Sequence, residues 1–309
     1  MKHKSSKILD SIFSKTTLLA SLTILVIAGS IFASLYMESA PAIQKFGFFR
    51  FLATADWDPV RENFGALTTV YGTFVTTILA LTIAIPVSLG IAIFVTELCP
   101  KFLKGPLSTA IELLAAIPSI IYGMWGLFTF APIMANHVEP FLKSTFGSIP
   151  LIGKLFEGPP MGIDILTASI VLSIMITPFI SSIARDTFNL TPQILKESAY
   201  GVGATRWEVV KDVIMPYSKL GVYGGIVIAL GRALGETMAV AFVLGNRHEI
   251  AKSLFDASAT ITVTLANEFT EADSDVYLSS LFLLAMVLFI LSFGTLALAK
   301  FVVNRRARS

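Results

Sequence analysis

Five long stretches of this chain contain no Asp, Glu, Lys or Arg, and this absence limits the folds that are open to it. They are residues 16–37, 63–96, 113–138, 165–184 and 276–299. An α-helix rises 1.5 Å per residue, so about 20 apolar residues cross the roughly 30 Å hydrocarbon core of a bilayer. Each stretch reaches that length. The pattern predicts an all-α polytopic membrane protein.

A sixth stretch, residues 220–246, is equally apolar except for Arg232 and Glu236. We therefore expect six transmembrane helices, which agrees with a chain that is only 14% charged, whereas globular chains carry roughly 25% charged residues. One cysteine excludes an intramolecular disulfide, and three scattered histidines predict no metal site. A net charge of +2 offers no basic surface for nucleic acid.

Six spans place both termini on one side of the membrane. Sorted by the predicted loops, fifteen Lys and Arg residues lie on the side of the termini and seven on the other, with Arg232 inside the membrane. Cytoplasmic loops carry an excess of Lys and Arg, so both termini and the second and fourth loops are expected to be cytoplasmic. The first apolar run exceeds the 7 to 15 residues of a signal peptide, so we expect an uncleaved first span.

The spans and loops predict three segments. Residues 1–62 hold the cytoplasmic N-terminus, the first transmembrane helix and an outward segment. Residues 63–303 form a five-helix core that includes the fourth loop, defined as residues 185–219, and residues 304–309 form a cytoplasmic tail.

Arg232 lies near the middle of the fifth span in chain order. An arginine at the bilayer centre costs roughly 2.5 to 3.5 kcal/mol even on the mildest scale, so a function is expected for it. Glu236 follows four residues later, on the same face of a continuous helix and about 6 Å nearer the outside. A guanidinium is a planar fork of donors that suits oxyanions. We predict an anion pathway lined by Arg232 and Glu236, which pair when the pathway is empty; the alternative is a purely structural salt bridge.

Three further features predict local geometry. Glycines at small-x-x-x-small spacing predict close packing of the fifth span; they are Gly221, Gly225, Gly231 and Gly235. Pro86 and Pro118 are expected to interrupt the second and third spans. Glu112 is expected to extend toward water from a position about 9 Å inside the membrane, with a role in coupling as the alternative.

The fourth loop is predicted to form two short helices around a glycine hinge. Thr191 and Pro192 supply an N-cap and a first-turn proline for the first helix, which ends at Gly201 and Gly203. Residues 205–208, Thr-Arg-Trp-Glu, form a capping box that starts the second helix. Pro216 is expected to interrupt that helix before the fifth span.

The same loop resembles the EAA loop of ABC importer permeases, whose pattern is E-A-A-x3-G-x9-I-x-L-P. The matching residues are Glu197, Ala199, Gly203 and Pro216, and the mild departures are Ser198, Val213 and Met215. In that family the loop docks on a separate ATP-hydrolysing subunit, so the resemblance implies that these four residues belong to the ATPase contact. An ordinary amphipathic loop on the membrane surface is the alternative.

Other runs are similar to the permeases of the phosphate-specific transport (Pst) system, from about Trp57 to the C-terminus. They are residues 231–240 (Gly-Arg-Ala-Leu-Gly-Glu-Thr-Met-Ala-Val), residues 115–126 (Ala-Ala-Ile-Pro-Ser-Ile-Ile-Tyr-Gly-Met-Trp-Gly), Phe64-Gly65 and Tyr71-Gly72-Thr73. The long outward segment after the first span and the Phe64-Gly65 pair look more like the PstC type than the PstA type.

This resemblance implies a type I ABC importer permease fold (MetI-like) in the bacterial inner membrane. It implies a phosphate pathway that includes Arg232 and Glu236. It also implies three kinds of partner: a homologous PstA-type permease, two PstB-type ATPase subunits that bind ATP and Mg, and a PstS-type phosphate-binding protein.

We expect no catalysis, cofactor or metal in this chain itself. Residues 147–154 come near a P-loop, but the spacing between Gly147 and Gly153 is one residue too long and Leu155 replaces the Ser or Thr that binds magnesium. Two rival functions stay open at this point. One is a permease for another oxyanion, namely molybdate, tungstate or sulfate, and the other is an ion-coupled secondary transporter or channel.

Overall fold

The structure is a computed structural model that describes residues 2–150 and 152–308, with the side chains of residues 10–150, 152–303 and 305. Met1 and Ser309, at the outer ends of the predicted N-terminal segment and tail, lie outside the described residues. The helices of the first half are α1 (Lys2–Glu38), α2 (Ala40–Phe46), α3 (Phe48–Ala53), α4 (Leu67–Ile93), α5 (Lys101–Ala116), α6 (Ser119–Trp125), α7 (Ala131–Ile133) and α8 (Glu139–Phe146).

The helices of the second half are α9 (Ile165–Asn189), α10 (Gln193–Gly201), α11 (Arg206–Glu208), α12 (Met215–Leu234), α13 (Met238–Ala241), α14 (Ile261–Glu268) and α15 (Asp275–Arg308). Two short antiparallel strands, β1 (Trp57–Asp58) and β2 (Asn63–Phe64), pair with each other. The π-helical segments are η1 (Phe94–Leu98), η2 (Gly126–Phe130), η3 (Met134–Val138) and η5 (Val209–Ile214), and η4 (Gly153–Phe156) is a 3-10 helix.

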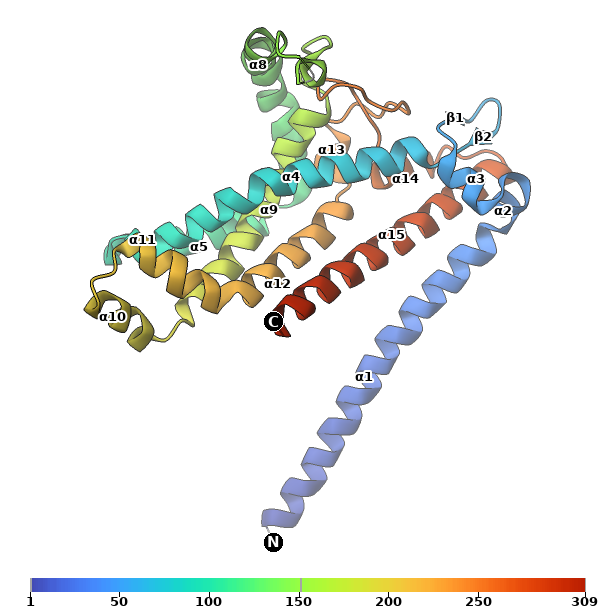
Figure 1. Ribbon diagram of the computed structural model, residues 1–309. Coiled ribbons are helices and arrows are strands. Elements are labelled where there is room, and N and C mark those ends of the chain that lie inside the picture. Colours follow the sequence, from blue (N-terminus) through green and yellow to red (C-terminus); the bar gives the residue numbers. More distant parts are fainter. Residues whose placement is uncertain (1, 151, 309) are drawn as a thin grey trace.

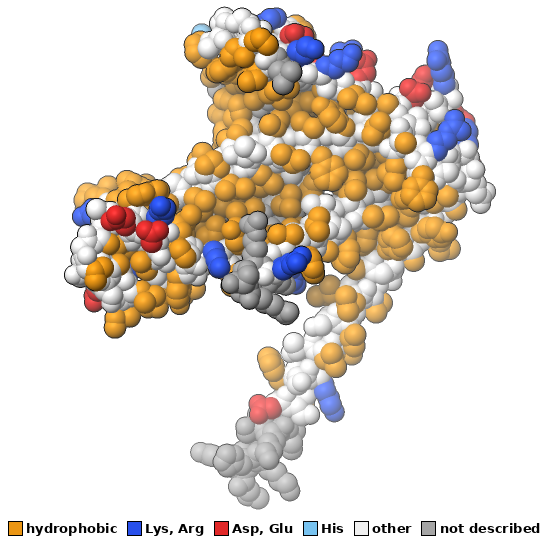
Figure 2. Space-filling model, in the orientation of Figure 1, with side chains coloured by type: hydrophobic (Ala, Val, Ile, Leu, Met, Phe, Trp, Pro, Cys, Tyr) orange, Lys and Arg blue, Asp and Glu red, His pale blue; other side chains and the backbone are white. Residues whose placement is uncertain are grey.

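A bundle of long helices forms the body of the molecule, and α1 leads away from it (Figure 1). Five described segments are long and apolar enough to cross a bilayer: Asp10–Glu38, Leu67–Leu98, Ile165–Asn189, Arg206–Leu234 and Asp275–Val303. In the space-filling view, apolar side chains cover the middle of the face shown, while charged side chains gather toward its margins (Figure 2). This distribution is typical of a protein whose middle contacts lipid.

The sixth predicted span is a bent pair of helices. The segments Lys101–Ala116 and Ser119–Phe146 meet at an angle of 90°. Ile117 between them is extended, with ψ at 129°, because the ring of Pro118 disfavours helical geometry at the residue before it. The interruption predicted at Pro118 is therefore confirmed. The one predicted at Pro86 is wrong, since α4 continues through that residue.

The helix α9 is the centre of the bundle. It packs against α4, α12 and α5, and it is the most buried of the candidate spans. Glycines of α12 allow close approach: a methyl group at Gly225 would lie 3.1 Å from the Cβ of Ile183 in α9, and one at Gly221 would overlap Thr187. Gly231 packs on Leu296 of α15. The predicted role of these glycines in helix packing is confirmed for those three positions.

The fifth span differs from the prediction at both ends. It begins at Arg206 and crosses Pro216 without a break, because the π-helical segment η5 precedes the proline and joins α12 directly. The interruption expected at Pro216 is therefore wrong. At the other end α12 stops at Leu234, and a separate short helix, α13, follows after Gly235, Glu236 and Thr237. The continuous helix predicted over residues 220–246 does not form.

A buried carboxylate anchors the end of the molecule opposite the fourth loop. Glu268 of α14 accepts hydrogen bonds from Trp57 Nε1 at 2.6 Å and from the Tyr277 hydroxyl at 2.7 Å, and it lies 3.0 Å from His248 Nε2. These groups come from β1, α15 and the segment after α13. One carboxylate therefore joins β1, which is 211 residues away in the sequence, to two segments of the C-terminal part of the chain.

Substitution of Gly72 in α4 provides a test of how closely the loop after α13 packs on the bundle. A side chain at Gly72 would overlap the carbonyl group of Ala259, which is backbone and cannot rotate away. We expect Gly72→Ala to lower the thermal unfolding midpoint of the purified complex, by the equivalent of about 1–3 kcal/mol. Gly90→Ala on the same helix is the matched control, because nothing lies within 4 Å there. It should be neutral or stabilising by up to ~1 kcal/mol, and equal losses in both variants would contradict the packing described.

Candidate functional site

Arg232 lies in the last turn of α12, is half-buried, and contacts an aromatic ring. Its guanidinium carbon is 4.4 Å from the centroid of the Phe179 ring of α9. Its Nε atom is buried and has no hydrogen-bond partner among the described residues, and no described carboxylate lies within ion-pair distance of it. Arg232 therefore keeps its full positive charge within the bundle.

Glu236 lies beyond the end of α12, in the break before α13. Its side chain is buried, and Oε1 accepts a hydrogen bond from the backbone N–H of Ala239 at 3.1 Å. Its carbonyl oxygen accepts a hydrogen bond from the Thr262 hydroxyl at 2.6 Å. Glu236 thus satisfies a free backbone donor in the first turn of α13 and ties the break to α14.

The predicted pairing of Arg232 with Glu236 is wrong. It required a helix that continues through Gly235, so that positions four apart share one face. Because α12 ends at Leu234, each charge lies at a helix terminus instead: the cation at the carboxyl end of α12 and the carboxylate at the amino end of α13. These are the ends whose dipoles stabilise each sign of charge. The two helix ends at the break, and not a salt bridge between the side chains, therefore stabilise the charges of Arg232 and Glu236.

Tyr122 supports the bend beside this site. It comes from α6, is buried, and donates a hydrogen bond from its hydroxyl to the carbonyl oxygen of Leu114 in α5, at 2.9 Å. The bond spans the 90° bend and satisfies a carbonyl at the end of α5. Tyr122 and Ala233, the neighbour of Arg232, belong to one hydrophobic cluster. The bend and the charged break therefore pack into the same core.

The fourth loop forms the two predicted helices. In α10, Glu197 is exposed and Ala199 is half-buried, and Gly203 turns the chain with a φ of +90° that favours glycine. The capping box is confirmed: Glu208 N–H donates to the Thr205 hydroxyl at 3.4 Å, and Thr205 N–H donates to Glu208 Oε2 at 2.7 Å.

The predicted cap at Thr191 is wrong. Pro192 is the N-cap of α10, and the Thr191 hydroxyl lies 3.3 Å from the Ser218 hydroxyl of α12 instead. The Thr191 hydroxyl therefore links the start of α10 to α12 by a hydrogen bond.

Several large apolar side chains of this loop are exposed. The exposed fraction is 70% for Ile194, 87% for Val202 and 66% for Trp207. In Figure 2 this end of the molecule, over α10 and α11, carries apolar side chains beside acidic and basic ones. Exposed apolar groups that are rimmed by charge are typical of a surface that binds another protein.

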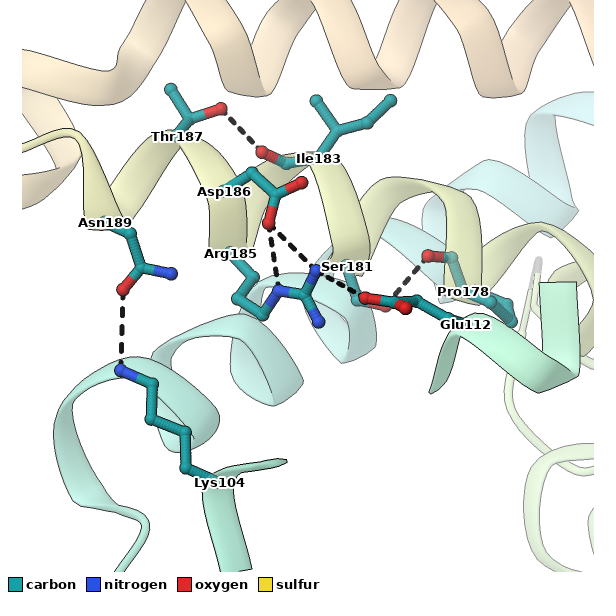
Figure 3. Close-up of polar contacts among 9 residues, drawn as sticks. All are labelled: Lys104, Glu112, Pro178, Ser181, Ile183, Arg185, Asp186, Thr187 and Asn189. Atoms are coloured by element: carbon teal, nitrogen blue, oxygen red, sulfur yellow. Dashed lines mark hydrogen bonds and ion pairs between the residues drawn. The ribbon is translucent and has the colours of Figure 1, made fainter. Parts of the chain in front are cut away.

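Glu112 has a partner that the sequence analysis did not predict. Figure 3 shows Arg185 of α9 between Glu112 of α5 and Asp186: Nη2 donates to Glu112 Oε1 at 2.8 Å and to Asp186 Oδ1 at 2.9 Å. The Glu112 side chain is 56% exposed, as expected for one that extends toward water, but Arg185 is only 11% exposed. The ion pair joins α5 to α9 at the start of the fourth loop.

A second unpredicted group is a pair of buried carboxyls away from the fourth loop. Glu139 of α8 and Asp164, the N-cap of α9, are both fully buried. Asp164 Oδ1 accepts a hydrogen bond from Thr167 N–H at 2.8 Å, while Oδ2 and Glu139 Oε1 have no partner among the described residues. Burial, together with the neighbouring Glu139 carboxyl, raises the pKa of Asp164 to about 8. Burial of the two neighbouring carboxyls therefore favours the protonated form of Asp164.

The described residues contain no group of three or more His, Cys, Asp or Glu side chains that could hold a metal ion. The chemistry available at the break is that of a retained cation, with donors that fit an oxyanion.

Comparison with known proteins places most of the chain among transport components. The family described as "Binding-protein-dependent transport system inner membrane component" matches residues 85–308. The phosphate transport system permease protein PstC of Mesorhizobium japonicum is 52% identical over 296 residues, which cover 96% of this chain and 90% of that protein. The PstC protein of Pasteurella multocida is 48% identical over 298 residues, covering 96% and 92%.

A solved structure supports the fold. The crystal structure of a bacterial ABC transporter involved in the import of the acidic polysaccharide alginate contains a chain that matches with a TM-score of 0.61 at 16% identity, covering 97% of this chain and 99% of that one. The predicted ABC importer permease fold and the predicted resemblance to phosphate permeases are confirmed. The cytoplasmic position of the termini and the roles of the site residues stay predictions.

The ion pairs of Arg185 with Glu112 and Asp186 predict that neutralising the carboxylates destabilises the protein more than neutralising the arginine. Removing both carboxylates with Glu112→Gln and Asp186→Asn leaves an unpaired buried cation, which costs about 3–5 kcal/mol. Arg185→Gln leaves two carboxylates that are more than half exposed, which water can solvate, so its loss should be smaller. Thermal unfolding of the purified complex measures both. The exposed pair of Arg247 and Glu249 supplies the control, because Glu249→Gln should change little. A larger loss for Arg185→Gln would contradict this assignment.

Asp164 predicts a specific pH dependence. Its pKa is about 8 in the folded chain, against 3.8 for an ordinary aspartate, so between about pH 4 and pH 8 the folded state keeps a proton that the unfolded state releases. Stability should fall as pH rises through this window, by up to ~1.4 kcal/mol per unit. Asp164→Asn imitates the protonated carboxyl and keeps the cap on α9, so the unfolding midpoint of that variant should depend less on pH than that of the wild type. Identical pH profiles in the variant and the wild type would contradict the assignment of the raised pKa to Asp164.

Proposed function

The chain belongs to the PstC family of phosphate transport permeases, within the binding-protein-dependent inner membrane transport components, and we propose that it forms half of the pathway for inorganic phosphate in an ATP-driven importer. It is a multi-pass membrane protein and a transporter subunit. The names of its relatives and the chemistry of Arg232 support phosphate as the substrate.

The observation that carries the proposal is the unneutralised cation at the break between α12 and α13. Arg232 has no described carboxylate within ion-pair distance, and its Nε donor is unused. A desolvated guanidinium binds an oxyanion through parallel charged hydrogen bonds, which are among the stronger ones in proteins. Phosphate entering the pathway would supply the charge and the acceptors that Arg232 lacks.

Glu236 has a different part in this proposal from the one that the sequence suggested. Its carboxylate is bound to the backbone at the start of α13, so it fixes the helix break and keeps a negative charge near the pathway. An anion that reaches Arg232 does not have to displace it. The negative charge of Glu236 limits how tightly phosphate is held and so favours its release.

Coupling to ATP hydrolysis is assigned to the fourth loop. We propose that Glu197, Ala199, Gly203 and Pro216 belong to the contact with an ATPase subunit of the PstB type, two of which bind and hydrolyse ATP with Mg. The exposed side chains of Ile194, Val202 and Trp207 support a docking role for this surface. A PstA-type permease completes the pathway, and a PstS-type binding protein delivers phosphate.

This assignment also proposes the orientation and the division of the chain. The fourth loop and both termini lie in the cytoplasm. Residues 1–62 carry the first span and the outward segment, residues 63–303 form the permease core, and residues 304–309 form the tail.

Substitution of Arg232 tests the proposed pathway. In cells that lack the chromosomal copy, we expect Arg232→Gln to reduce uptake of labelled phosphate at least thirtyfold, because loss of one partner of a desolvated charge pair costs ~2–5 kcal/mol. Assembly should persist, measured by co-purification with the ATPase subunit. Phosphate uptake by Arg232→Lys should be intermediate, since lysine keeps the positive charge but lacks the planar pair of guanidinium donors. Arg247→Gln, at an exposed arginine, is the control.

The rival functions make different predictions in the same cells. Normal phosphate uptake by Arg232→Gln would remove Arg232 from the pathway. Phosphate uptake that survives deletion of this gene alone, with loss of molybdate uptake, would assign the chain to another oxyanion. Transport by the purified chain without an ATPase, driven by an ion gradient, would indicate a secondary transporter.

A further inference from the structure

Among the described residues, the ring of Phe179 is the aromatic face that contacts the Arg232 guanidinium. The guanidinium carbon lies 4.4 Å from the ring centroid, well inside the range of about 6 Å in which a cation is attracted to an aromatic face. Phe179 directly follows Pro178 in α9 and is itself half-buried. Nothing in the pathway proposal for Arg232 requires an aromatic residue at this position.

A cation in a bundle can be stabilised by a carboxylate or by an aromatic face, and the two have opposite consequences for an anion pathway. A carboxylate neutralises the cation, so an incoming anion must first break an ion pair. An aromatic face attracts the cation through its quadrupole and carries no net charge. The cation stays positive, and its N–H donors, which lie at the edge of the guanidinium plane, stay free for an oxyanion.

The separation between ring and cation is governed by a close contact between α12 and α9. The helix α12 packs on α9 through Gly221 against Thr187 and through Gly225 against Ile183. Phe179 and Arg232 lie farther along the same two helices, one on each. Close backbone approach at the glycines therefore holds the two side chains at a defined spacing.

We propose that Phe179 is a positioning residue that holds Arg232 charged and in place while the pathway is empty. The inference rests on the proposed role of Arg232 as the anion-binding residue of the pathway. Without the ring, the guanidinium loses the partner that fixes its position, and Glu236 is the carboxylate nearest to it in the sequence. The fraction of molecules in which Arg232 is ready for an anion then falls.

Three variants test the proposal through phosphate uptake. Phe179→Leu removes the aromatic face and keeps an apolar side chain, Phe179→Tyr keeps the face, and Phe282→Leu is the control. Phe282 is also half-buried in a span, but its aromatic neighbour is Phe269. We expect Phe179→Leu to lower the maximal rate of labelled phosphate uptake about five- to thirtyfold, the factor that corresponds to a cation–π contact of ~1–2 kcal/mol. Phe179→Tyr and Phe282→Leu should stay within about twofold of the wild type.

A thermal cycle on the purified complex separates this role from packing. The unfolding midpoint is measured without phosphate for wild type, Phe179→Leu, Arg232→Gln and the double variant. If the ring acts through the cation, Phe179→Leu lowers the midpoint in the wild-type background and has little further effect beside Arg232→Gln. Equal losses in both backgrounds would mean that Phe179 only fills space, and the proposal would be overturned.

The two readouts also distinguish failure of this inference from failure of the proposed function. Wild-type uptake by Phe179→Leu, or equal loss of uptake in Phe179→Leu and Phe179→Tyr with normal assembly, overturns the positioning role. Normal phosphate uptake by Arg232→Gln overturns the pathway role of Arg232, whatever the thermal cycle shows for the contact between the two side chains.

Discussion

A charge within a bilayer has to be stabilised by the protein, because lipid offers neither water nor counter-ions. In this chain the break between α12 and α13 meets that constraint. It places Arg232 at the carboxyl end of one helix and Glu236 at the amino end of the next, where the dipoles of the two helices stabilise each charge separately. Neither side chain has to neutralise the other. Two neighbouring helices support the break: Thr262 of α14 donates a hydrogen bond to the Glu236 carbonyl oxygen, and α9 supplies an aromatic face for Arg232.

The parts of the fold that were predicted from sequence depend on local patterns. Lengths free of charge identified the membrane segments, and the capping box at Thr205 and Glu208 identified the start of a helix. The break at Gly235 was hidden, because the apolar residues after it continue the hydropathy signal. Hydropathy reports whether a segment tolerates lipid and does not report whether its helix is continuous. Pro216 misled for the opposite reason, since a π-helical segment accommodates a proline that would interrupt a regular helix.

The site itself was predicted only in part. Arg232 stood out because an isolated charge in an apolar stretch is costly wherever the chain folds. Its partner Phe179 has no sequence signal, because a phenylalanine in a membrane segment is ordinary. Arg185 was counted as a loop cation, yet it binds Glu112, which is 73 residues away in the sequence. Contacts between helices of this kind depend on which faces pack together, and no local pattern encodes that.

The unbroken path from the capping box to Arg232 has a mechanical consequence. Arg206–Leu234 is one helical rod of 29 residues, about 40 Å long, with the fourth loop at one end and the charged break at the other. Such a rod resists torsion, so a rotation applied at the loop turns the guanidinium through a similar angle. The two ends of this helix are therefore expected to move together. A movement of the fourth loop would then be transmitted directly to the guanidinium, because no helix break separates the two.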